Sequence, residues 1–458
     1  MYQINFHQPE AVHFIGIGGI SMSGLAEILL KENFTVSGSD HRQSPLTEQL
    51  EKAGAIIFYG QRASNIIEGI DVVVYTAAIH EDNEEYRAAL CRGLPMLSRA
   101  ELLGQLMTNY KIPIAVSGTH GKTTTTSMLS HVLLSADLDP TISVGGILKA
   151  IHGNIRVGHS EIFVTEACEY TNSFLHFFPK ISIILNIDED HLDFFKDLDD
   201  IRHSFRRFAE LLPADGTLVI NGEIPDYEDI TRGLPCNVVT YGPDISMDYR
   251  AANISHDEMG RASFDFIKSG EFIARITLSV NGDHNVSNAL SALAVADILG
   301  IPVDTAGQGL KDFHGTKRRF EYKGTFNGVT VIDDYAHHPT EITASLTSAM
   351  YYPHRETWCV FQPHTYTRTK LLFDDFIKAL SHTDHVILAD IYAARETDTL
   401  GISSGDLAEA LKERGVDACY LPSFEAIENF CRENCQTGDL LITMGAGDVV
   451  NIGEALLK

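Results

Sequence analysis

A glycine-rich loop that contains one lysine and several threonines is the segment of the sequence best suited to chemistry. In order, it consists of Gly118, Thr119, His120, Gly121, Lys122, Thr123 and Thr124. It stands between an apolar run at 112–116 and a segment at 127–134 whose apolar residues recur at helical spacing. A loop between a strand and a helix directs backbone N–H groups and the positive helix end at an anion. Because the lysine adds positive charge and a threonine hydroxyl suits magnesium, the loop predicts a nucleotide phosphate site and an ATP-driven enzyme.

The spacing of this loop departs from the common phosphate-loop pattern G-x-x-x-x-G-K-[ST], because Val116 stands where the first glycine is expected. The alternative interpretation is a helix capped by a glycine turn, with Lys122 on a solvated surface. The order of strand, loop, Lys-Thr and helix favours the phosphate site.

Acidic residues follow the next two apolar runs. Glu166 comes directly after the run at 162–165, and Asp190 and His191 come after the run at 181–187. In open α/β sheets, ligands bind beyond the carboxyl ends of the strands, so these three side chains could reach a magnesium ion near a γ-phosphate. Carboxylate oxygens suit magnesium, whereas imidazole is a less typical ligand. Solvated acids at helix starts are the alternative.

A second glycine segment lies near the beginning of the chain. Gly16-x-Gly18-x-x-Ser21 follows an apolar run at 11–15, and Asp40 lies roughly 20 residues further on, where a ribose-binding acid belongs. Serine replaces the third glycine of the dinucleotide pattern. The segment favours a nucleotide binder, an NAD-dependent oxidoreductase included. A tight strand-to-helix turn of any α/β sheet is the alternative.

Histidines and arginines gather in the last third of the chain. Arg318 and Arg319 come first, and the segments 333–340 and 362–369 each follow an apolar run. Such a cluster suits an anionic ligand, because guanidinium matches phosphate and carboxylate geometry. The adjacent histidines at 337–338 lack a third zinc ligand at a convincing spacing, and a surface pair is the alternative.

Two amides open an alanine-rich segment at 289–294. Asn285 and Asn288 could read the edge of a base, but the residues alone favour helix capping.

Apolar runs alternate with helical patterns along the whole chain, which predicts the α/β class with mostly parallel sheets. A length of 458 residues suggests about three domains. We place them at 1–110, 111–315 and 316–458, with a β-hairpin at 264–276 inside the second.

The net charge of −27 argues against nucleic acid and against stable association with anionic membranes. The first residues show no signal-peptide pattern, and the apolar runs are far shorter than the roughly 20 residues of a membrane span. Seven cysteines, an odd number scattered through the chain, indicate free thiols in a reducing cytoplasm.

Taken together, these motifs resemble the Mur ligase family of bacterial cell-wall synthesis, over nearly the whole chain. The resemblance rests on the segments 13–24, 118–124, 166–170, 186–193, 284–288, 318–320, 333–340 and 361–369. It implies a Rossmann-like N-terminal domain for a UDP-sugar, a central P-loop-type ATPase domain with a mostly parallel sheet, and a Rossmann-like C-terminal domain that closes over ATP.

The resemblance also assigns roles to residues. Lys122 would contact the β/γ-phosphates, with Thr123 on magnesium and Glu166 and His191 on a second ion. The positions matching UDP-sugar contacts are His13, Gly16, Ile17, Gly18, Gly19, Ser39 and Asp40. Those matching further ATP contacts are Asn285, Asn288, Arg319 and Asp334. For the two asparagines, contact with ATP thus replaces helix capping as our expectation. Those around the amino acid and acyl group are Tyr335, His337, His364 and Arg368.

The implied reaction is ATP-dependent amide formation. The lactyl carboxylate of UDP-N-acetylmuramate attacks the γ-phosphate to give an acyl phosphate, and the amine of L-alanine then displaces phosphate. ATP and magnesium are the expected cofactors, with two ions, or manganese in their place. The oligomeric state, monomer or homodimer, stays open.

Two segments, 18–24 and 361–369, resemble the alanine-adding members of the family rather than those that attach a tripeptide to the same sugar nucleotide. Glu169-Tyr170 departs from the Glu-Ser-Asp of many alanine-adding members. Folylpolyglutamate synthase shares the ATPase core but is not expected to carry this first domain. An NAD-dependent oxidoreductase and a non-catalytic nucleotide-binding regulator are the alternatives from other classes.

Overall fold

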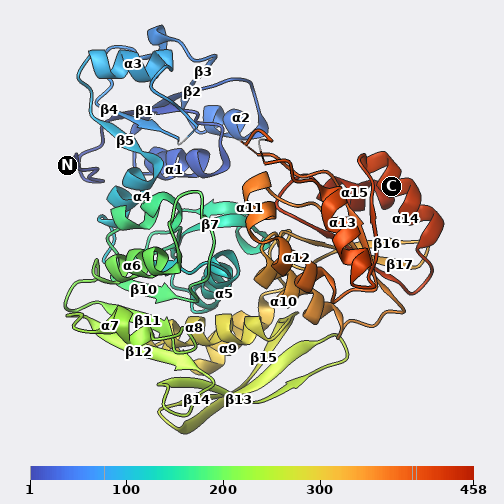
Figure 1. Ribbon diagram of the computed structural model, residues 1–458. Helices are drawn as coiled ribbons and strands as arrows, with labels where there is room; N and C mark the ends of the chain where they lie inside the picture. The colour runs from blue at the N-terminus through green and yellow to red at the C-terminus, as the bar shows by residue number, and fades with distance from the viewer. Residues whose placement is uncertain (1, 77, 395, 399) are drawn as a thin grey trace. The chain divides into compact units, whose positions relative to one another are not determined.

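The structure, a computed structural model, describes residues 2–76, 78–394, 396–398 and 400–458. It divides into two compact units, which are described separately: unit 1 comprises 1–187 and 202–240, and unit 2 comprises 188–201 and 241–458. Parallel strands alternate with helices in both units (Figure 1), so the predicted α/β class is confirmed. No helix among the described residues is long and apolar enough to cross a membrane. The seven cysteines are free thiols, as predicted.

The first sheet of unit 1 has the strand order β3-β2-β1-β4-β5, and all its strands are parallel. Its strands are β1 (Ala11–Ile15), β2 (Thr35–Asp40), β3 (Ile56–Tyr59), β4 (Val72–Tyr75) and β5 (Met96–Ser98). Its helices are α1 (Ile20–Lys31), α2 (Pro45–Lys52), α3 (Glu84–Cys91) and α4 (Arg99–Met107). The strand order reverses at β1, and ligands of open α/β sheets bind at such a switch point. The glycine segment directly after β1 is therefore well placed for a ligand.

The second sheet of unit 1 carries the phosphate loop. Its central strand β6 (Ile112–Ser117) lies between β9 (Ile162–Ala167) and β10 (Ile181–Ile184), parallel to both. The other strands in this unit are β7 (Thr141–Leu148), β8 (Gly153–Arg156), β11 (Thr217–Asn221) and most of β12 (Asn237–Gly242). The helical elements are α5 (Lys122–Ser135), η2 (Lys149–Ile151), η3 (Tyr170–His176), α7 (Tyr227–Thr231) and the greater part of α6 (Leu198–Ala209).

Strand β10 is shorter than the run at 181–187 that we predicted as one strand. The strand ends at Ile184. Leu185 N still donates to Ser117 O at the end of β6, but Asn186 O accepts from Thr119 N of the phosphate loop.

In unit 2, the end of β12 pairs in parallel with β13 (Tyr249–His256), and the antiparallel strands β14 (Arg261–Lys268) and β15 (Glu271–Asn281) follow. The hairpin predicted at 264–276 is confirmed. Its two turn residues, Ser269 and Gly270, both have positive φ, as a type I′ turn requires. Helices α8 (His284–Ile298) and α9 (Val303–Asp312) pack on these strands.

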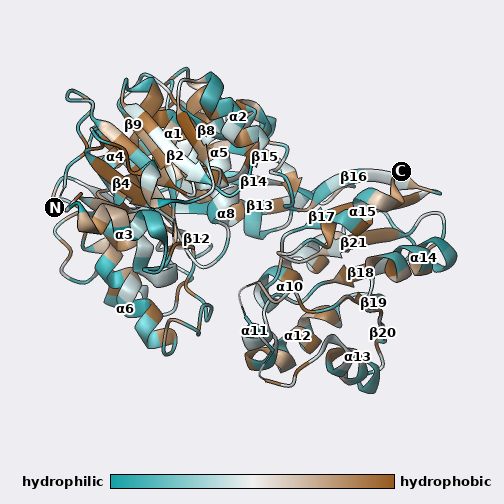
Figure 2. Cartoon of the chain, turned by 90° about the horizontal axis from the view of Figure 1, so that it is seen from above, coloured by the Kyte–Doolittle hydropathy of each residue, from teal (hydrophilic) through white to brown (hydrophobic). Residues whose placement is uncertain are grey.

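The last sheet has the order β16-β17-β21-β18-β19-β20, and only the edge strand β16 is antiparallel. Its strands are β16 (Glu321–Phe326), β17 (Val329–Asp334), β18 (Thr357–Phe361), β19 (His385–Leu388), β20 (Asp417–Tyr420) and β21 (Leu440–Met444). One face packs on α10 (Pro339–Ala349), α12 (Phe373–Leu380) and α13 (Ser404–Glu413), and the other on α14 (Phe424–Asn434) and α15 (Val450–Leu456). The apolar strands thus lie between two layers of helices (Figure 2), which is the expected Rossmann-like arrangement.

Candidate active site

The phosphate loop has the strand–loop–helix geometry that the sequence predicted. It leaves β6 after Ser117 and enters α5 at Lys122. Gly118 and Gly121 have φ of +142° and +84°, a region that favours glycine, and a Cβ at position 118 would lie 2.9 Å from the Cβ of Leu185. Asn186 braces the loop, because its Oδ1 accepts a 2.8 Å hydrogen bond from the backbone N–H of His120.

Gly121 caps helix α5, as the alternative interpretation had it, but Lys122 is held in place, so the part of that alternative that put it on a solvated surface is wrong. Its Nζ donates to the carbonyls of Gly118 (2.5 Å) and Thr119 (2.9 Å) and lies 3.0 Å from a carboxylate oxygen of Glu169. Burial by itself lowers the pKa of Lys122. The negative charges around it, above all the Glu169 carboxylate, raise that pKa by more, so the pKa lies above its ordinary value. The lysine therefore keeps its positive charge beside the loop.

Glu166 and Thr123 lie side by side at the edge of the sheet. The Thr123 hydroxyl donates to Glu166 Oε2 at 3.1 Å, and the Gly145 N–H donates to Glu166 Oε1. Glu166 belongs to strand β9, so the alternative of a solvated acid at a helix start is wrong for it. A hydroxyl and a carboxylate are hard oxygen ligands, and this pair fits a magnesium ion.

The glycine segment after β1 forms a second tight loop. The N–H groups of Gly16 and Ile17 both donate to Ser39 O at 2.9 Å, and Gly18 N donates to Asp40 Oδ2 at 2.8 Å. Helix α1 begins at Ile20, and no side chain among the described residues caps its N-terminus. The start of this helix therefore offers backbone N–H groups to an anionic ligand.

Two of the residues matched to UDP-sugar contacts lie beneath this loop. His13 and Ser39 are fully buried. His13 Nδ1 bonds to the Ser37 hydroxyl at 2.9 Å, and the Ser39 hydroxyl donates to Glu85 at 2.5 Å. Neither side chain reaches the surface in this structure, so they support the loop from below.

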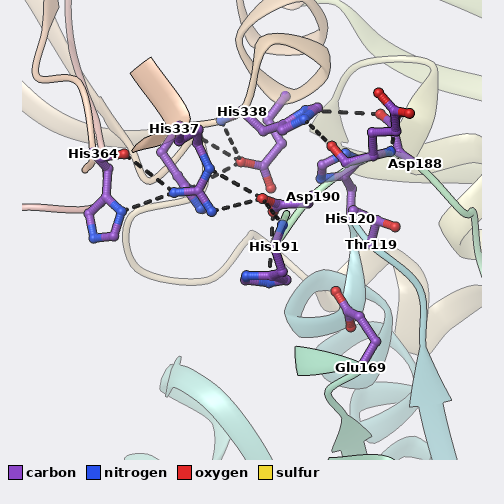
Figure 3. Close-up of polar contacts among 12 residues, drawn as sticks. Thr119, His120, Glu169, Asp188, Asp190, His191, His337, His338 and His364 are labelled. Carbon is purple, nitrogen blue, oxygen red and sulfur yellow. Dashed lines mark hydrogen bonds and ion pairs between the residues drawn. The ribbon is translucent and has the colours of Figure 1, made fainter. Parts of the chain in front are cut away.

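Unit 2 brings Arg368 and Asp190 together, although 178 positions separate them in the sequence. Arg368 donates to Asp190 Oδ1 from Nε (3.2 Å) and Nη2 (2.8 Å), and its Nη1 lies 3.0 Å from His364 Nδ1 (Figure 3). Burial raises the pKa of Asp190, but the positive charge of Arg368 outweighs it and holds that pKa well below its ordinary value. His191, next in the chain, has a left-handed backbone (φ +56°) and an imidazole Nε2 3.8 Å from Asp190.

Two neutral imidazoles stand next to this ion pair. The rings of His337 and His364 lie 5.6 Å apart, and Tyr335 packs edge-on against His337. Burial lowers the pKa of each histidine to about 4, with Arg368 adding to the effect. At neutral pH both can accept a hydrogen bond from a substrate.

His338 has a structural role distinct from that of His337. It is buried, its Nδ1 accepts from Thr340 N at the start of α10, and its Nε2 lies 2.9 Å from the carbonyl of Glu189 (Figure 3). The interpretation of 337–338 as a surface pair is therefore wrong.

Asp334 and Arg319 lie at the end of β17. Asp334 accepts from Ala336 N (2.8 Å), Phe320 N (3.2 Å) and the Ser345 hydroxyl, and burial raises its pKa to about 6. The Arg319 guanidinium lies over the Tyr335 ring, 5.1 Å from its centroid.

Asn285 and Asn288 lie inside helix α8, so the capping interpretation is wrong. Asp283 precedes the helix, and neither asparagine occupies that position. Asn285 Nδ2 donates back to Asn281 O at 2.7 Å, and Asn288 Nδ2 donates to Asn285 Oδ1 at 3.0 Å.

Within unit 1, the structure gathers Lys122, Thr123 and Glu166. Within unit 2, it gathers His191, His337, His364 and Arg368. Reasoning from the sequence missed two ion pairs, Glu169 with Lys122 and Asp190 with Arg368. A pairing between residues that lie tens of positions apart leaves no local signal in the sequence.

Three features define a nucleotide-dependent α/β enzyme. They are a phosphate loop on a parallel sheet, a carboxylate beside the threonine of that loop, and a second parallel sheet whose first strand leads into a glycine loop. Family models match in three consecutive parts: the Mur ligase catalytic domain over residues 11–111, the Mur ligase middle domain over 116–296, and the Mur ligase glutamate ligase domain over 318–447. The chain belongs to the Mur ligase family.

Individual relatives agree with this assignment. The chain is 60% identical to the UDP-N-acetylmuramate–L-alanine ligases of Agathobacter rectalis and Lachnospira eligens, each alignment covering 100% of both proteins. Among solved structures, it resembles the UDP-N-acetylmuramate–alanine ligase of Thermotoga maritima, with a TM-score of 0.81, 29% identity and 98% coverage of both chains. The murein peptide ligase of Psychrobacter arcticus gives a TM-score of 0.71 at 28% identity, again with 98% coverage of both.

Proposed function

We propose that the chain is an ATP-dependent ligase of peptidoglycan biosynthesis. It joins L-alanine to the lactyl carboxylate of UDP-N-acetylmuramate and releases UDP-N-acetylmuramoyl-L-alanine, ADP and phosphate. The observation that carries this proposal is 60% identity, over the full length of both chains, to enzymes named for that reaction. The placement of Lys122, Thr123 and Glu166 at one loop supports the ATP-dependent chemistry.

The first step is phosphoryl transfer. A lactyl carboxylate oxygen bonds to the γ-phosphorus, the bond to the β,γ-bridging oxygen breaks, and ADP leaves with that electron pair. Such transfers depend on positioning and charge neutralisation more than on covalent help. Lys122 supplies a fixed positive charge at the loop, where the β- and γ-phosphates would lie.

Thr123 would hold one magnesium ion, and we assign Glu166 and His191 to a second; the hydroxyl and carboxylate oxygens of Thr123 and Glu166 fit magnesium. When bound, magnesium neutralises phosphate charge and withdraws electron density from the γ-phosphorus. Manganese has similar ligand preferences and could replace it. Asn285, Asn288, Arg319 and Asp334 remain our candidates for further ATP contacts.

The second step is acyl transfer. The amine nitrogen of L-alanine bonds to the acyl carbon and gives a tetrahedral intermediate. The bond from that carbon to the phosphate oxygen then breaks, phosphate leaves with the electron pair, and the nitrogen releases a proton to leave the amide. We assign Tyr335, His337, His364 and Arg368 to the amino acid and acyl group. Arg368 supplies a fork of N–H donors that matches a carboxylate, and the two neutral histidines supply acceptors beside it.

The UDP-sugar would bind at the first glycine loop, with its diphosphate toward Gly19 and the N-terminus of α1. We place the domain boundaries at 110/111 and 315/316. We also propose that the enzyme works in the cytoplasm, where its nucleotide substrates are found, as a monomer or a homodimer.

Phosphate release measured with each substrate left out in turn tests the proposal. Release should require ATP, UDP-N-acetylmuramate and L-alanine together. Release that requires a tripeptide in place of L-alanine would identify the chain as a murein peptide ligase. Nicotinamide binding or reduction in place of phosphate release would identify an oxidoreductase.

A further inference from the structure

A buried carboxylate lies beneath the first glycine loop, in a position to which the proposed chemistry assigns no role. Glu85 is fully buried in the first turn of helix α3. A buried carboxylate is costly unless hydrogen bonds and positive charge compensate it. The hydrogen-bond partners of Glu85 therefore indicate which part of the structure this carboxylate stabilises.

Both carboxylate oxygens of Glu85 have partners from different strands and loops. Oε2 accepts from the Ser39 hydroxyl at 2.5 Å, at the end of β2. Oε1 accepts from Asn65 Nδ2 at 2.5 Å and from Arg62 N at 3.4 Å. His13 Nε2, on β1, lies 3.7 Å from Oε2.

The helix end adds to this compensation. Asn83 caps α3, with its side chain accepting from the backbone N–H groups of Glu85 and Tyr86. Glu85 thus lies in the positive first turn of a capped helix, where a carboxylate is favoured.

Ser39 connects this carboxylate to the glycine loop. While its hydroxyl donates to Glu85, its carbonyl accepts from both Gly16 N and Ile17 N at 2.9 Å. The next residue, Asp40, accepts from Gly18 N at 2.8 Å. Three consecutive N–H groups of the loop are therefore oriented by the end of β2, and Glu85 fixes the side chain at that end.

We infer that Glu85 is a positioning residue for the UDP-sugar site: through Ser39 it fixes the glycine loop in the shape that presents Gly19 and the start of α1 to the diphosphate. The inference rests on the proposed function. Ser39 and His13 match UDP-sugar contact positions although both are buried. Support of the glycine loop from below gives both residues a role that does not require contact with the ligand. A glutamine at position 85 would keep one acceptor oxygen but replace the other with a donor NH₂ group, so either the Ser39 or the Asn65 contact would be lost.

The test is calorimetric binding of UDP-N-acetylmuramate to the full-length wild type, Glu85→Gln and Ser39→Ala, with ATP titrated separately. Both variants should lose at least about ten-fold in UDP-sugar affinity, the size expected for a hydrogen bond to a charged group, while ATP affinity stays within two-fold. The double variant should lose no more than the worse single variant, since both act through one contact. Glu84→Gln, an exposed carboxylate one residue earlier on α3, should bind as the wild type does.

The possible outcomes separate the two proposals. Wild-type protein that binds no UDP-sugar contradicts the proposed function, and the inference falls with it. Wild type that binds, with Glu85→Gln binding equally well, overturns the inference alone. If Glu85→Gln and Ser39→Ala both lose UDP-sugar and ATP affinity together and melt early, the two residues only stabilise the fold and the inference is also wrong. Ser39→Ala introduces no misplaced donor, so an early-melting Glu85→Gln beside a Ser39→Ala that loses UDP-sugar affinity alone supports the inference.

Discussion

Arg368 donates two hydrogen bonds, from Nε and Nη2, to a single oxygen of Asp190, and both side chains are largely buried. The pair fixes the direction in which the guanidinium presents its remaining N–H groups. Because Arg368 is assigned to the amino acid and acyl group, Asp190 should act on amino-acid binding without touching the substrate.

Asp190→Asn should therefore raise the KM for L-alanine by about ten-fold or more, since it removes the charge from a buried charged pair. The KM for ATP should change far less. Steady-state kinetics in each substrate measures this split. Asp199→Asn, which changes an exposed carboxylate in the same segment, is the matched control. An unchanged KM for L-alanine in Asp190→Asn would show that the ion pair does not serve this site.

Lys122→Ala should lower kcat by at least about a hundred-fold, as expected for loss of one preorganised charge at a reacting phosphoryl group. Circular dichroism should report a retained fold. Lys111→Ala, which removes an exposed lysine just before strand β6, should leave kcat unchanged. Full activity in Lys122→Ala would mean that the loop does not hold the transferred phosphate.

His337 should make the protein less stable as the pH falls. Its folded pKa of about 4 lies below the value of about 6.5 in an unfolded chain, so its contribution is fully present above pH 6.5 and is lost as the pH falls toward 4. Between pH 7 and pH 5 the loss is at most about 2 kcal/mol. Asp334, with a raised pKa of about 6, acts in the opposite direction over the same range.

Urea unfolding of wild type and His337→Asn at pH 7 and pH 5 isolates the histidine, because Asp334 contributes equally to both proteins. The wild type should lose more stability than the variant on going to pH 5. Equal losses would contradict the lowered pKa of His337.

Two helix glycines should respond to alanine in opposite directions. A Cβ at Gly104 in α4 would lie 1.9 Å from the carbonyl oxygen of His176, whereas one at Gly307 in α9 would lie 3.3 Å from the flexible Cδ1 of Ile276. Gly104→Ala should destabilise by about 1–3 kcal/mol or more. Gly307→Ala should be neutral or stabilise by up to about 1 kcal/mol, the helix propensity gain. Thermal unfolding midpoints that shift alike would contradict the close contact at Gly104.

Local spacing was enough to predict the strand, loop and helix around Lys122, because glycine, lysine and helical periodicity are all features of neighbouring residues. The alternation of apolar runs likewise predicted the parallel sheets, and the Ser269-Gly270 turn predicted the hairpin. Strand β10 was overestimated because the apolar run continues past Ile184, where the backbone turns to bond with the phosphate loop.

The site was harder to predict wherever partners lie far apart in sequence. Asp190 was first considered as a metal ligand, and its pairing with Arg368 appears only once the chain is folded. Asn285 was assigned to a cap because polar residues open the helix, but the helix begins at His284, so Asn285 already lies inside it. Burial of His13 and Ser39 also depends on packing around Glu85, which no local pattern reveals.

The most direct test of the central claim, an acyl phosphate made from the lactyl carboxylate, is an oxygen-transfer measurement. UDP-N-acetylmuramate labelled with ¹⁸O in that carboxylate is incubated with enzyme, ATP and L-alanine, and the released phosphate is analysed by mass spectrometry. The account predicts one ¹⁸O atom in each phosphate, together with a product heavier by one alanine residue. Unlabelled phosphate alongside the same product would contradict it.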